Sequence, residues 1–454
     1  MQSTLEYERK LEAEPGWELP DLGGEPLEPR VFTSVYHDTP DTSLARAGIT
    51  LRRRTERGKS VWQLKLPVGD ARLELEEPGG PAALPDPIAK LLGTYIRRGR
   101  LAPVAELRTR RHGVLVTRKD THAEATIDEV SVMDAHRVAR EFVEIEVELK
   151  DGSPQRVDAI AAELCKAGAR RSDEVPKLFR VLGIGREKLP DDPFERLRAM
   201  LRGQLREILA NDPGTRLGAD PESLHDMRVA VRRSRALLRA GSKLIANDVQ
   251  TVSLELKWLG GLLGNVRDLD VLIEELRAQA DELDRTDAAA ARRLIRKLEQ
   301  RRVRARRAML KALDGDRYTR LLQRFDEEID ALQPSEIDTS LAEIAEAAVK
   351  KVRSTADEAG DDPPDELLHK IRKRGKRARY AGELAGMKKL VKSAKRLQDV
   401  LGEHQDAVVA EETLRSLAAG APAEQALAAG RLIDAERARR AKSRKDWRKL
   451  LRGL

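Results

Sequence analysis

The spacing of apolar residues changes once along this chain, near Pro190, and this change divides the fold into two kinds of structure. Before it, apolar and polar residues alternate, for example over residues 61–66 and 142–150, as in half-buried β-strands. After it, apolar residues recur at helical spacing in segments rich in Ala, Leu, Arg, Lys and Glu. We therefore expect a multidomain α+β protein, with a strand-rich domain over residues 1–189 and a helical domain over residues 194–454.

The net charge and the residue content narrow the expected partners. The 85 Lys and Arg residues exceed the 77 Asp and Glu residues, and the resulting net charge of +8 attracts polyanions. Aromatic residues make up only 3% of the chain, which argues against single-stranded nucleic acid, since its binding proteins usually stack bases on aromatic side chains. The single cysteine, Cys165, excludes disulfides and thiolate metal sites. A polar, charged start and the lack of a long apolar run predict a cytoplasmic protein without a membrane span.

Acidic residues of the first domain gather on one face of their strands. Side chains two positions apart on a strand point to the same side, so residues 144–149 present three carboxylates on one face and three apolar side chains on the other. By the same rule Glu6, Glu8 and Lys10 share a face. Such dense charge is costly unless it is compensated, and hard divalent cations such as Mg²⁺ prefer oxygen ligands. These strands therefore predict a metal site.

Cationic side chains alternate in the same way on neighbouring strands. Arg52 and Arg54 lie opposite Leu51, and Lys65 lies opposite Leu64. We interpret this pattern as a closed sheet with a polar lumen and an exterior covered by helices, in which the carboxylates hold metal and the cations hold phosphate oxygens. The alternative interpretation is a solvated sheet face with cross-strand ion pairs.

Six blocks of the first domain, in this order, resemble one family. They are Glu-Tyr-Glu-Arg-Lys at 6–10, Tyr-His-Asp-Thr at 36–39 followed by Leu44, Leu-Arg-Arg-Arg at 51–54, Trp-Gln-Leu-Lys-Leu-Pro at 62–67, the acidic strand at 144–149, and Ser-Asp-Glu-Val-Pro-Lys at 172–177. Together they span about residues 1–185 and resemble the CYTH domain, also called the triphosphate tunnel metalloenzyme. The resemblance implies an antiparallel eight-stranded β-barrel tunnel that binds a triphosphate and one or two Mg²⁺ or Mn²⁺ ions.

The resemblance also implies roles for individual residues. The implied metal ligands are Glu6, Glu8, Glu144 and Glu146, with Asp128 and Glu148 as further candidates. The implied phosphate-binding residues are Lys10, Arg52, Arg54, Lys65, Lys177 and an inward-facing arginine, Arg110 or Arg111. The implied reaction is attack of water on a terminal phosphoryl group, with Glu6, Glu8 and Lys10 as catalytic residues. The general base stays open among the tunnel carboxylates.

The helical domain contains one pattern twice. The residues three, seven, eight and ten positions after His225 match in charge those after His369. Downstream, residues 263–268 parallel residues 401–406, although the second copy lacks the arginine and the second acid of the first. Two landmarks in the same order predict an internal duplication in which each half is a helical bundle. The cations at helical spacing repel one another, and an anionic ligand relieves that repulsion.

These repeated blocks resemble the CHAD domain, a conserved-histidine α-helical domain. The resemblance implies two four-helix bundles, over about residues 194–360 and 361–454, and a basic cleft that binds polyphosphate. The residues at matching positions are His225, Arg228, Arg232, Arg235, His369, Arg372, Lys376 and Arg379. The alternative interpretations are a solvated basic face and, for the histidines, a packing role. Residues 424–454 predict a final basic helix.

Three functions are compatible with this sequence. The first is a metal-dependent triphosphatase whose basic domain captures polyphosphate. The second is a non-catalytic polyphosphate-binding protein, associated with polyphosphate granules or with sensing. The third is an RNA-binding protein that uses the basic helices. The charged strands favour the first function. The sequence indicates no adenine or thiamine pocket, and the combination with the basic second domain favours inorganic triphosphate or short polyphosphate as substrate.

Overall fold

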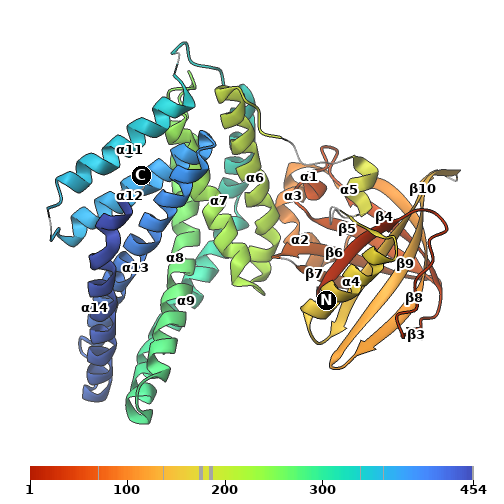
Figure 1. Ribbon diagram of the computed structural model, residues 1–454, viewed down its shortest axis with the longest axis horizontal. Coiled ribbons are helices and arrows are strands. Elements are labelled where there is room, and N and C mark those ends of the chain that lie inside the picture. The colour runs from red at the N-terminus through yellow and green to blue at the C-terminus, as the bar shows by residue number, and fades with distance from the viewer. Residues whose placement is uncertain are drawn as a thin grey trace. The chain divides into compact units, whose positions relative to one another are not determined.

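The computed structural model describes two compact parts of the chain (Figure 1). The described residues are 1–69, 71–135, 137–172, 177–183, 188–337, 339–360, 362–451 and 454, without the side chains of Lys177, Arg180 and Asp446. One part comprises Met1–Glu187 and Leu209–Leu224, and the other comprises Lys188–Ile208 and His225–Leu454. No helix among the described residues has the length and apolar character needed to cross a membrane.

The first part is built on one antiparallel sheet. Its strands are β1 (Gln2–Glu6), β2 (Glu8–Ala13), β3 (Glu25–Pro26), β4 (Arg30–Asp38), β5 (Thr50–Glu56), β6 (Lys59–Val68), β7 (Ala71–Pro78), β8 (Ala102–Arg118), β9 (Thr121–Asp134), β10 (Arg137–Asp151) and β11 (Arg170–Arg171). The strand order is β1-β7-β6-β5-β4-β8-β9-β10-β2-β11, and β3 pairs with β8.

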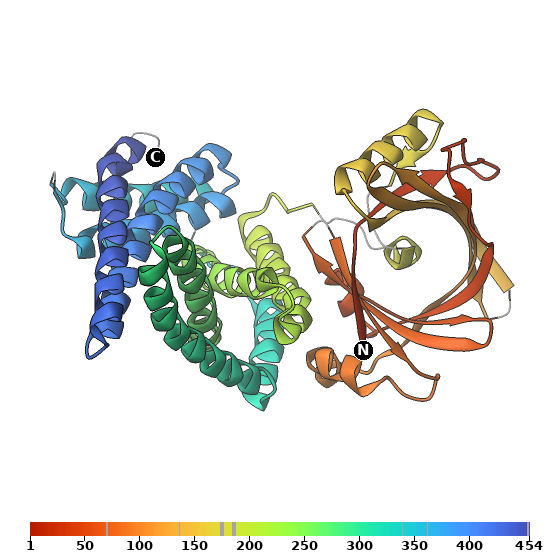
Figure 2. The ribbon, with the colours of Figure 1, turned by 90° about the horizontal axis from the view of Figure 1, so that it is seen from below.

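The sheet closes on itself at Tyr7. Only this residue separates β1 from β2, yet β1 pairs with β7 and β2 pairs with β10, at opposite ends of the strand order. One continuous segment therefore joins the two edges, and Figure 2 shows the resulting ring of strands. With β1 and β2 counted as one strand and the two-residue β3 and β11 set aside, eight strands remain among the described residues, as predicted.

Helices cover part of the barrel wall and one end of its interior. Ile145 and Val147 of β10 share a core cluster with Val157 and Leu164 of α4 (Pro154–Lys166), so α4 covers the outer face there. Each such buried aliphatic side chain contributes about 1.5–3 kcal/mol. The short helix α5 (Lys177–Leu182) lies within the ring in Figure 2 and packs Leu178 on a second cluster. That cluster includes Tyr36, Leu107, Val130 and Phe142. Three further short helices, α1 (Ser43–Arg46), α2 (Asp86–Leu91) and α3 (Gly93–Arg98), also belong to this part.

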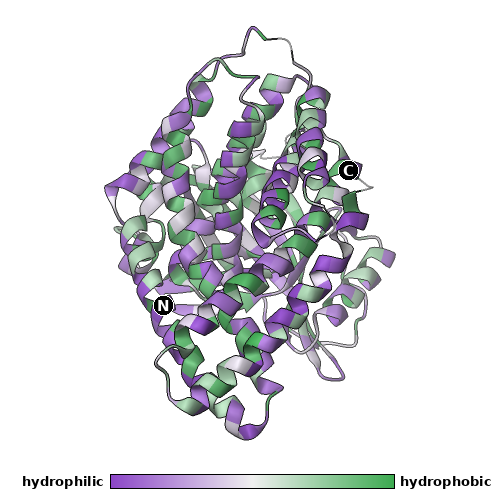
Figure 3. Cartoon of the chain, turned by 90° about the vertical axis from the view of Figure 1, so that its left-hand side faces the viewer, coloured by the Kyte–Doolittle hydropathy of each residue, from purple (hydrophilic) through white to green (hydrophobic). Residues whose placement is uncertain are grey.

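The second part is all helical. Its helices are α6 (Pro193–Leu217, shared with the first part), α7 (Pro221–Ala240), α8 (Gln250–Asp281), α9 (Arg285–Leu313), α10 (Asp316–Ala331), α11 (Leu341–Asp357), α12 (Asp365–Leu384), α13 (Lys388–Ala418) and α14 (Ala423–Leu451). Hydrophilic and hydrophobic residues alternate along these helices in Figure 3, as expected when each helix buries one stripe. The final basic helix predicted over residues 424–454 is α14, which buries Trp447.

The two repeats correspond helix by helix. His225 lies on α7 and His369 on α12, while the two downstream motifs lie on α8 and α13. Consequently α6–α9 correspond to α11–α14, with α10 inserted between the repeats. The C-terminal ends of α8 and α13 and the N-terminal halves of α9 and α14 share one core cluster, and this cluster joins the two repeats.

The second repeat begins earlier than the expected boundary at residue 361. Ala345 and Val352 of α11 lie in the same core cluster as Ile371 of α12, Leu397 of α13 and Trp447 of α14. A capping box between Ser340 and Glu343 starts α11. The Gly-Asp-Asp-Pro-Pro break after residue 359 therefore falls between α11 and α12 of one bundle, because Gly and Pro end a helix whether or not a bundle ends there.

Candidate functional site

One wall of the barrel lumen, formed by β2, β9 and β10, is acidic. Antiparallel pairing places Glu144, Glu146 and Glu148 of β10 beside one residue on each neighbouring strand. Those neighbours are Glu12, Lys10 and Glu8 on β2 and Asp128, Thr126 and Glu124 on β9. The predicted metal ligands on these three strands therefore lie on one face, opposite the face that packs on α4.

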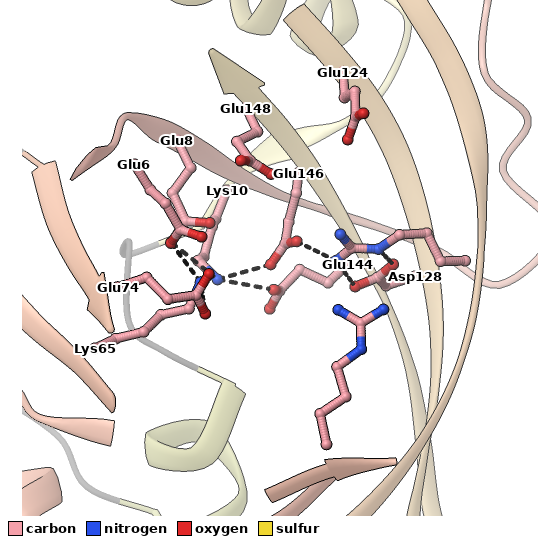
Figure 4. Close-up of polar contacts among 12 residues, drawn as sticks. Glu6, Glu8, Lys10, Lys65, Glu74, Glu124, Asp128, Glu144, Glu146 and Glu148 are labelled. Atoms are coloured by element: carbon pink, nitrogen blue, oxygen red, sulfur yellow. Dashed lines mark hydrogen bonds and ion pairs between the residues drawn. The ribbon is translucent and has the colours of Figure 1, made fainter. Parts of the chain in front are cut away.

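Lys10 lies at the centre of this acidic wall (Figure 4). Its Nζ atom is 2.9 Å from Glu146 Oε1, 3.4 Å from Glu144 Oε1 and 3.5 Å from Glu8 Oε1. Burial by itself lowers the pKa of Lys10, but the carboxylates of Glu146, Glu8 and Glu144 outweigh burial and raise that pKa well above its usual range. Lys10 is therefore a fixed positive charge among three carboxylates.

Glu6 reaches the same region from β1. Its carboxylate pairs with Lys65 of β6, whose Nζ atom is also 3.4 Å from Glu74 Oε1. Burial raises the pKa of Glu6 to about 7, Lys65 opposes this rise, and Glu74 adds to it. The negative charge on Glu6 is therefore only partly compensated. Glu74 was not predicted, although the alternation of Arg72, Glu74 and Glu76 with two leucines on β7 carried the signal.

Arg111 joins the acidic wall, whereas Arg110 does not. The Nε and NH2 atoms of Arg111 each donate to Asp128 at 2.6 Å, and Arg111 also pairs with Glu146. The Arg110 side chain is 67% exposed and pairs with Glu129, 3.4 Å away. Consecutive residues of β8 point to opposite faces, so only one of the two arginines can face the lumen. The prediction that Arg110 is a lumen residue is therefore wrong.

The wall formed by β4 and β5 is basic. Arg52 Nε donates to Gln63 Oε1 at 2.6 Å, and Arg52 NH1 donates to the Tyr36 hydroxyl at 3.2 Å. Burial, followed by the like charges of Arg52 and Arg30, lowers the pKa of Arg54 to about 10. An anion in the lumen would relieve this repulsion. The structure brings Arg52, Arg54, Lys65 and Arg111 to one lumen, while the side chain of Lys177 lies outside the described residues.

The lumen provides the donor set that a hard divalent cation prefers, because its acidic groups are all carboxylates. Among the described residues, however, no group of three or more His, Cys, Asp or Glu side chains is arranged so that it could hold a metal ion as it stands. Instead, Lys10, Lys65 and Arg111 lie between the carboxylates. A divalent cation fits these residues if it replaces such ion pairs, and the incompletely compensated Glu6 is consistent with that exchange.

A second cluster of charges lies in the helical part, and both repeats build it alike. Arg228 NH2 is 2.8 Å from Asp268 Oδ1, and the equivalent Arg372 NH2 is 3.9 Å from Asp406 Oδ1. Each arginine spans the gap between its own helix, α7 or α12, and the following helix of its repeat, α8 or α13.

The cations of the two repeats also act on each other. Burial, together with the charges of Arg372, Arg232 and Arg228, lowers the pKa of Lys376 to about 7, while Asp406 opposes this fall. Burial likewise lowers the pKa of Arg372, with Arg232 and Arg228 adding to the effect. Four of the predicted polyphosphate-binding residues, two from each repeat, therefore face one region.

The other predicted residues of the helical part have different surroundings. Arg379 lies 3.4 Å from Glu383, which also pairs with Arg233. Burial and then the charge of Arg239 lower the pKa of Arg235. His225 and His369 are half-buried at equivalent positions, and burial followed by Lys373 lowers the pKa of His369.

Comparisons with known proteins give the family. The CYTH domain family matches residues 4–180, and the CHAD domain family matches residues 199–415. An uncharacterized protein of Mycobacterium tuberculosis is 32% identical in an alignment 480 positions long, which covers 95% of this chain and 93% of that protein. The chain belongs to the family that joins a CYTH domain to a CHAD domain. The resemblance and the fold class predicted from the sequence are thereby confirmed.

Two solved structures resemble the CHAD half in fold, and one enzyme resembles part of the chain in sequence. PptA from Streptomyces chartreusis has a TM-score of 0.50 at 21% identity and covers 57% of this chain and 99% of that chain. The CHAD domain from the plant Ricinus communis has a TM-score of 0.50 at 28% identity, with 59% of this chain and 94% of that chain covered. Human thiamine-triphosphatase is 48% identical over 69 residues, which are 14% of this chain and 28% of that enzyme.

Proposed function

We propose that the CYTH domain hydrolyses inorganic triphosphate or short polyphosphate with a divalent metal, Mg²⁺ or Mn²⁺, and that the CHAD domain binds polyphosphate. The observation that carries this proposal is the barrel lumen, where a wall of buried carboxylates faces a wall of buried cations. Hydrolysis of a phosphoanhydride needs both, since the chain of phosphates and the metal carry opposite charges. Membership of the CYTH family and the similarity to thiamine-triphosphatase support phosphoanhydride chemistry.

The chain's own residues divide the work between the two walls. Glu6, Glu8, Glu144 and Glu146, with Asp128 and Glu148, would hold the metal, which when bound supplies Lewis-acid polarisation of phosphate oxygens. Lys10, Arg52, Arg54, Lys65 and Arg111 would bind the phosphate oxygens and stabilise the charge that develops as water attacks. The proton of that water would pass to one of the tunnel carboxylates.

An inorganic substrate is favoured over a nucleotide or thiamine ester by the rings of the basic wall. The Arg54 guanidinium lies 3.8 Å from the centre of the Phe32 ring, and the Tyr36 hydroxyl accepts a hydrogen bond from Arg52. The Arg52 guanidinium also lies 6.0 Å from the centre of the Tyr36 ring, so a base that stacked on the same face of either ring would compete with an arginine.

The test is release of orthophosphate from tripolyphosphate by the purified full chain with Mg²⁺ or Mn²⁺. Arg111→Ala and Arg110→Ala are matched variants, since the two residues are neighbours on β8 but face opposite sides of the wall. We expect Arg111→Ala to lower kcat by about 10²–10³, the typical cost of removing one preorganised charge-stabilising group, and Arg110→Ala to change it little. ATP and thiamine triphosphate are the comparison substrates. Absence of release with every divalent metal would reject the enzyme in favour of a polyphosphate-binding protein.

The polyphosphate function of the CHAD domain rests on the cluster of Arg228, Arg232, Arg372 and Lys376. Cations that lie close together lower one another's pKa, and a bound polyanion stabilises their protonated forms. In a competition at equal phosphate concentration, we expect polyphosphate to displace RNA from the full chain. The reverse order would favour RNA as the ligand. A cytoplasmic protein that associates with polyphosphate granules fits the same proposal.

A further inference from the structure

We propose that Asp268 and Asp406 are internal competitors for the polyphosphate site, each holding an arginine that an incoming phosphate must take over. This inference rests on the polyphosphate binding proposed above and deepens it, because it states how the cations of that site are partly neutralised before an anion binds.

The first observation is that the same contact is built twice. Asp268 of α8 pairs with Arg228, and Asp406 of α13 pairs with Arg372, at equivalent places in the two repeats. The duplicated chain has kept this pairing even though the residues around Asp406 differ from those around Asp268, with Gln405 and Val408 at the positions of Arg267 and Asp270.

The second observation is that each arginine lies in van der Waals range of a glycine on the next helix. Gly264 and Gly402 lie four residues before the two aspartates, one helical turn away on the same face. A Cβ atom on Gly264 would lie 3.5 Å from Arg228 Nε, and one on Gly402 would lie 3.6 Å from Arg372 NH2. Each guanidinium therefore rests on the bare surface of the next helix, beside the aspartate of that helix.

The third observation is that both carboxylates act on one shared group of charges. Although the Asp406 side chain is partly exposed, desolvation by the surrounding helices raises its pKa, Arg372 and Lys376 oppose the rise, and Asp268 of the other repeat adds to it. The groups that face Lys376 are Arg372, Arg232, Arg228 and Asp406, so cations outnumber carboxylates there. Two carboxylates among four cations leave this group of charges partly neutralised but still positive.

The exposure of the aspartates makes the contacts reversible. The side chains of Asp268 and Asp406 are 67% and 55% exposed, whereas that of Arg372 is only 19% exposed. An arriving phosphate chain would therefore turn the aspartates out into water and keep the arginines in place. Because exposed ion pairs are individually weak, the aspartates would delay and weaken binding without preventing it.

The experiment measures the affinity of the full chain for long-chain polyphosphate by calorimetry. Asp268→Asn with Asp406→Asn removes both competitors and preserves side-chain size. The matched control is Asp281→Asn with Asp434→Asn, which raises the net charge by the same amount. Asp281 pairs with Arg292 and Asp434 pairs with Arg437 on the helix surface. We expect the first pair of changes to tighten binding about threefold to tenfold, from two weak pairs lost, and the control pair to change it less than twofold.

The thermal midpoint of the ligand-free protein is measured alongside. We expect it to fall in the Asp268→Asn, Asp406→Asn variant, because the four cations then repel one another without compensation, and to recover when polyphosphate is added. Unchanged or weaker binding by this variant, while the wild type binds, would overturn the inference and assign the aspartates to holding the arginines in position. If neither protein binds polyphosphate, the proposed function of the CHAD domain falls, and the inference with it.

Discussion

Replacing Arg111 should show how strongly the lumen depends on paired charge. Arg111 donates twice to Asp128 at 2.6 Å, and the Asp128 side chain is fully buried. Breaking a buried ion pair by removing one partner costs about 3–5 kcal/mol, because the other charge stays behind without it. We therefore expect Arg111→Ala to destabilise the barrel by about 3–5 kcal/mol, a large share of the total stability of a typical domain.

A double variant tests the cause of that loss of stability. Asp128→Asn in the Arg111→Ala background removes the charge that Arg111 had compensated. We expect the double variant to recover about 2 kcal/mol of the loss, within the usual range for residues in direct contact. The control is Arg110→Ala, whose exposed pair with Glu129 should be worth about 0–1 kcal/mol.

Hydrogen exchange of the β8 and β9 amides is the assay. It reports opening of this ladder directly, so it does not require the two parts of the chain to unfold together. Hydrogen exchange measured without metal or phosphate reports only the contribution of the protein's own charges to the stability of this ladder. The reasoning is refuted if Arg111→Ala protects these amides as well as Arg110→Ala does, or if adding Asp128→Asn to Arg111→Ala makes the loss larger.

Three further predictions follow from the same structure. The pKa of Lys376 is lowered to about 7, and a polyanion favours its protonated form. The affinity for polyphosphate, measured by calorimetry, should therefore fall about tenfold between pH 6 and pH 8. This dependence on pH should become weaker in Lys376→Arg. Gly113→Ala should cost about 1–3 kcal/mol by hydrogen exchange, since its Cβ would meet Ala125 O at 2.2 Å, whereas Gly203→Ala, with open space around it in α6, should stabilise by about 0.5–1 kcal/mol. A chelator should abolish orthophosphate release from tripolyphosphate, and added Mg²⁺ or Mn²⁺ should restore it in the same assay.

The local spacing of apolar residues predicted most of the architecture. The change of apolar spacing near Pro190 separated strands from helices, because side chains alternate on a strand and recur every turn on a helix. The same rule put Glu144, Glu146 and Glu148 on one face of β10 before any contact was known. The repeated histidine-arginine register gave the duplication, and with it the equivalence of α7 and α12.

The tertiary structure decided what depends on partners distant in the chain. Whether Arg110 or Arg111 faces the lumen required the register of β8 against β9, and the role of Glu74 required β7 to lie beside β1. Closure of the barrel at Tyr7 required the two edges of the sheet to meet. The ion pairs of Asp268 and Asp406 required α7 to pack beside α8, and α12 beside α13, with the paired side chains facing each other. A sequence fixes the direction of a side chain relative to its own strand or helix, since that depends on neighbouring residues alone. Which opposing charge that side chain meets depends on how the whole chain packs, and only the folded protein supplies it.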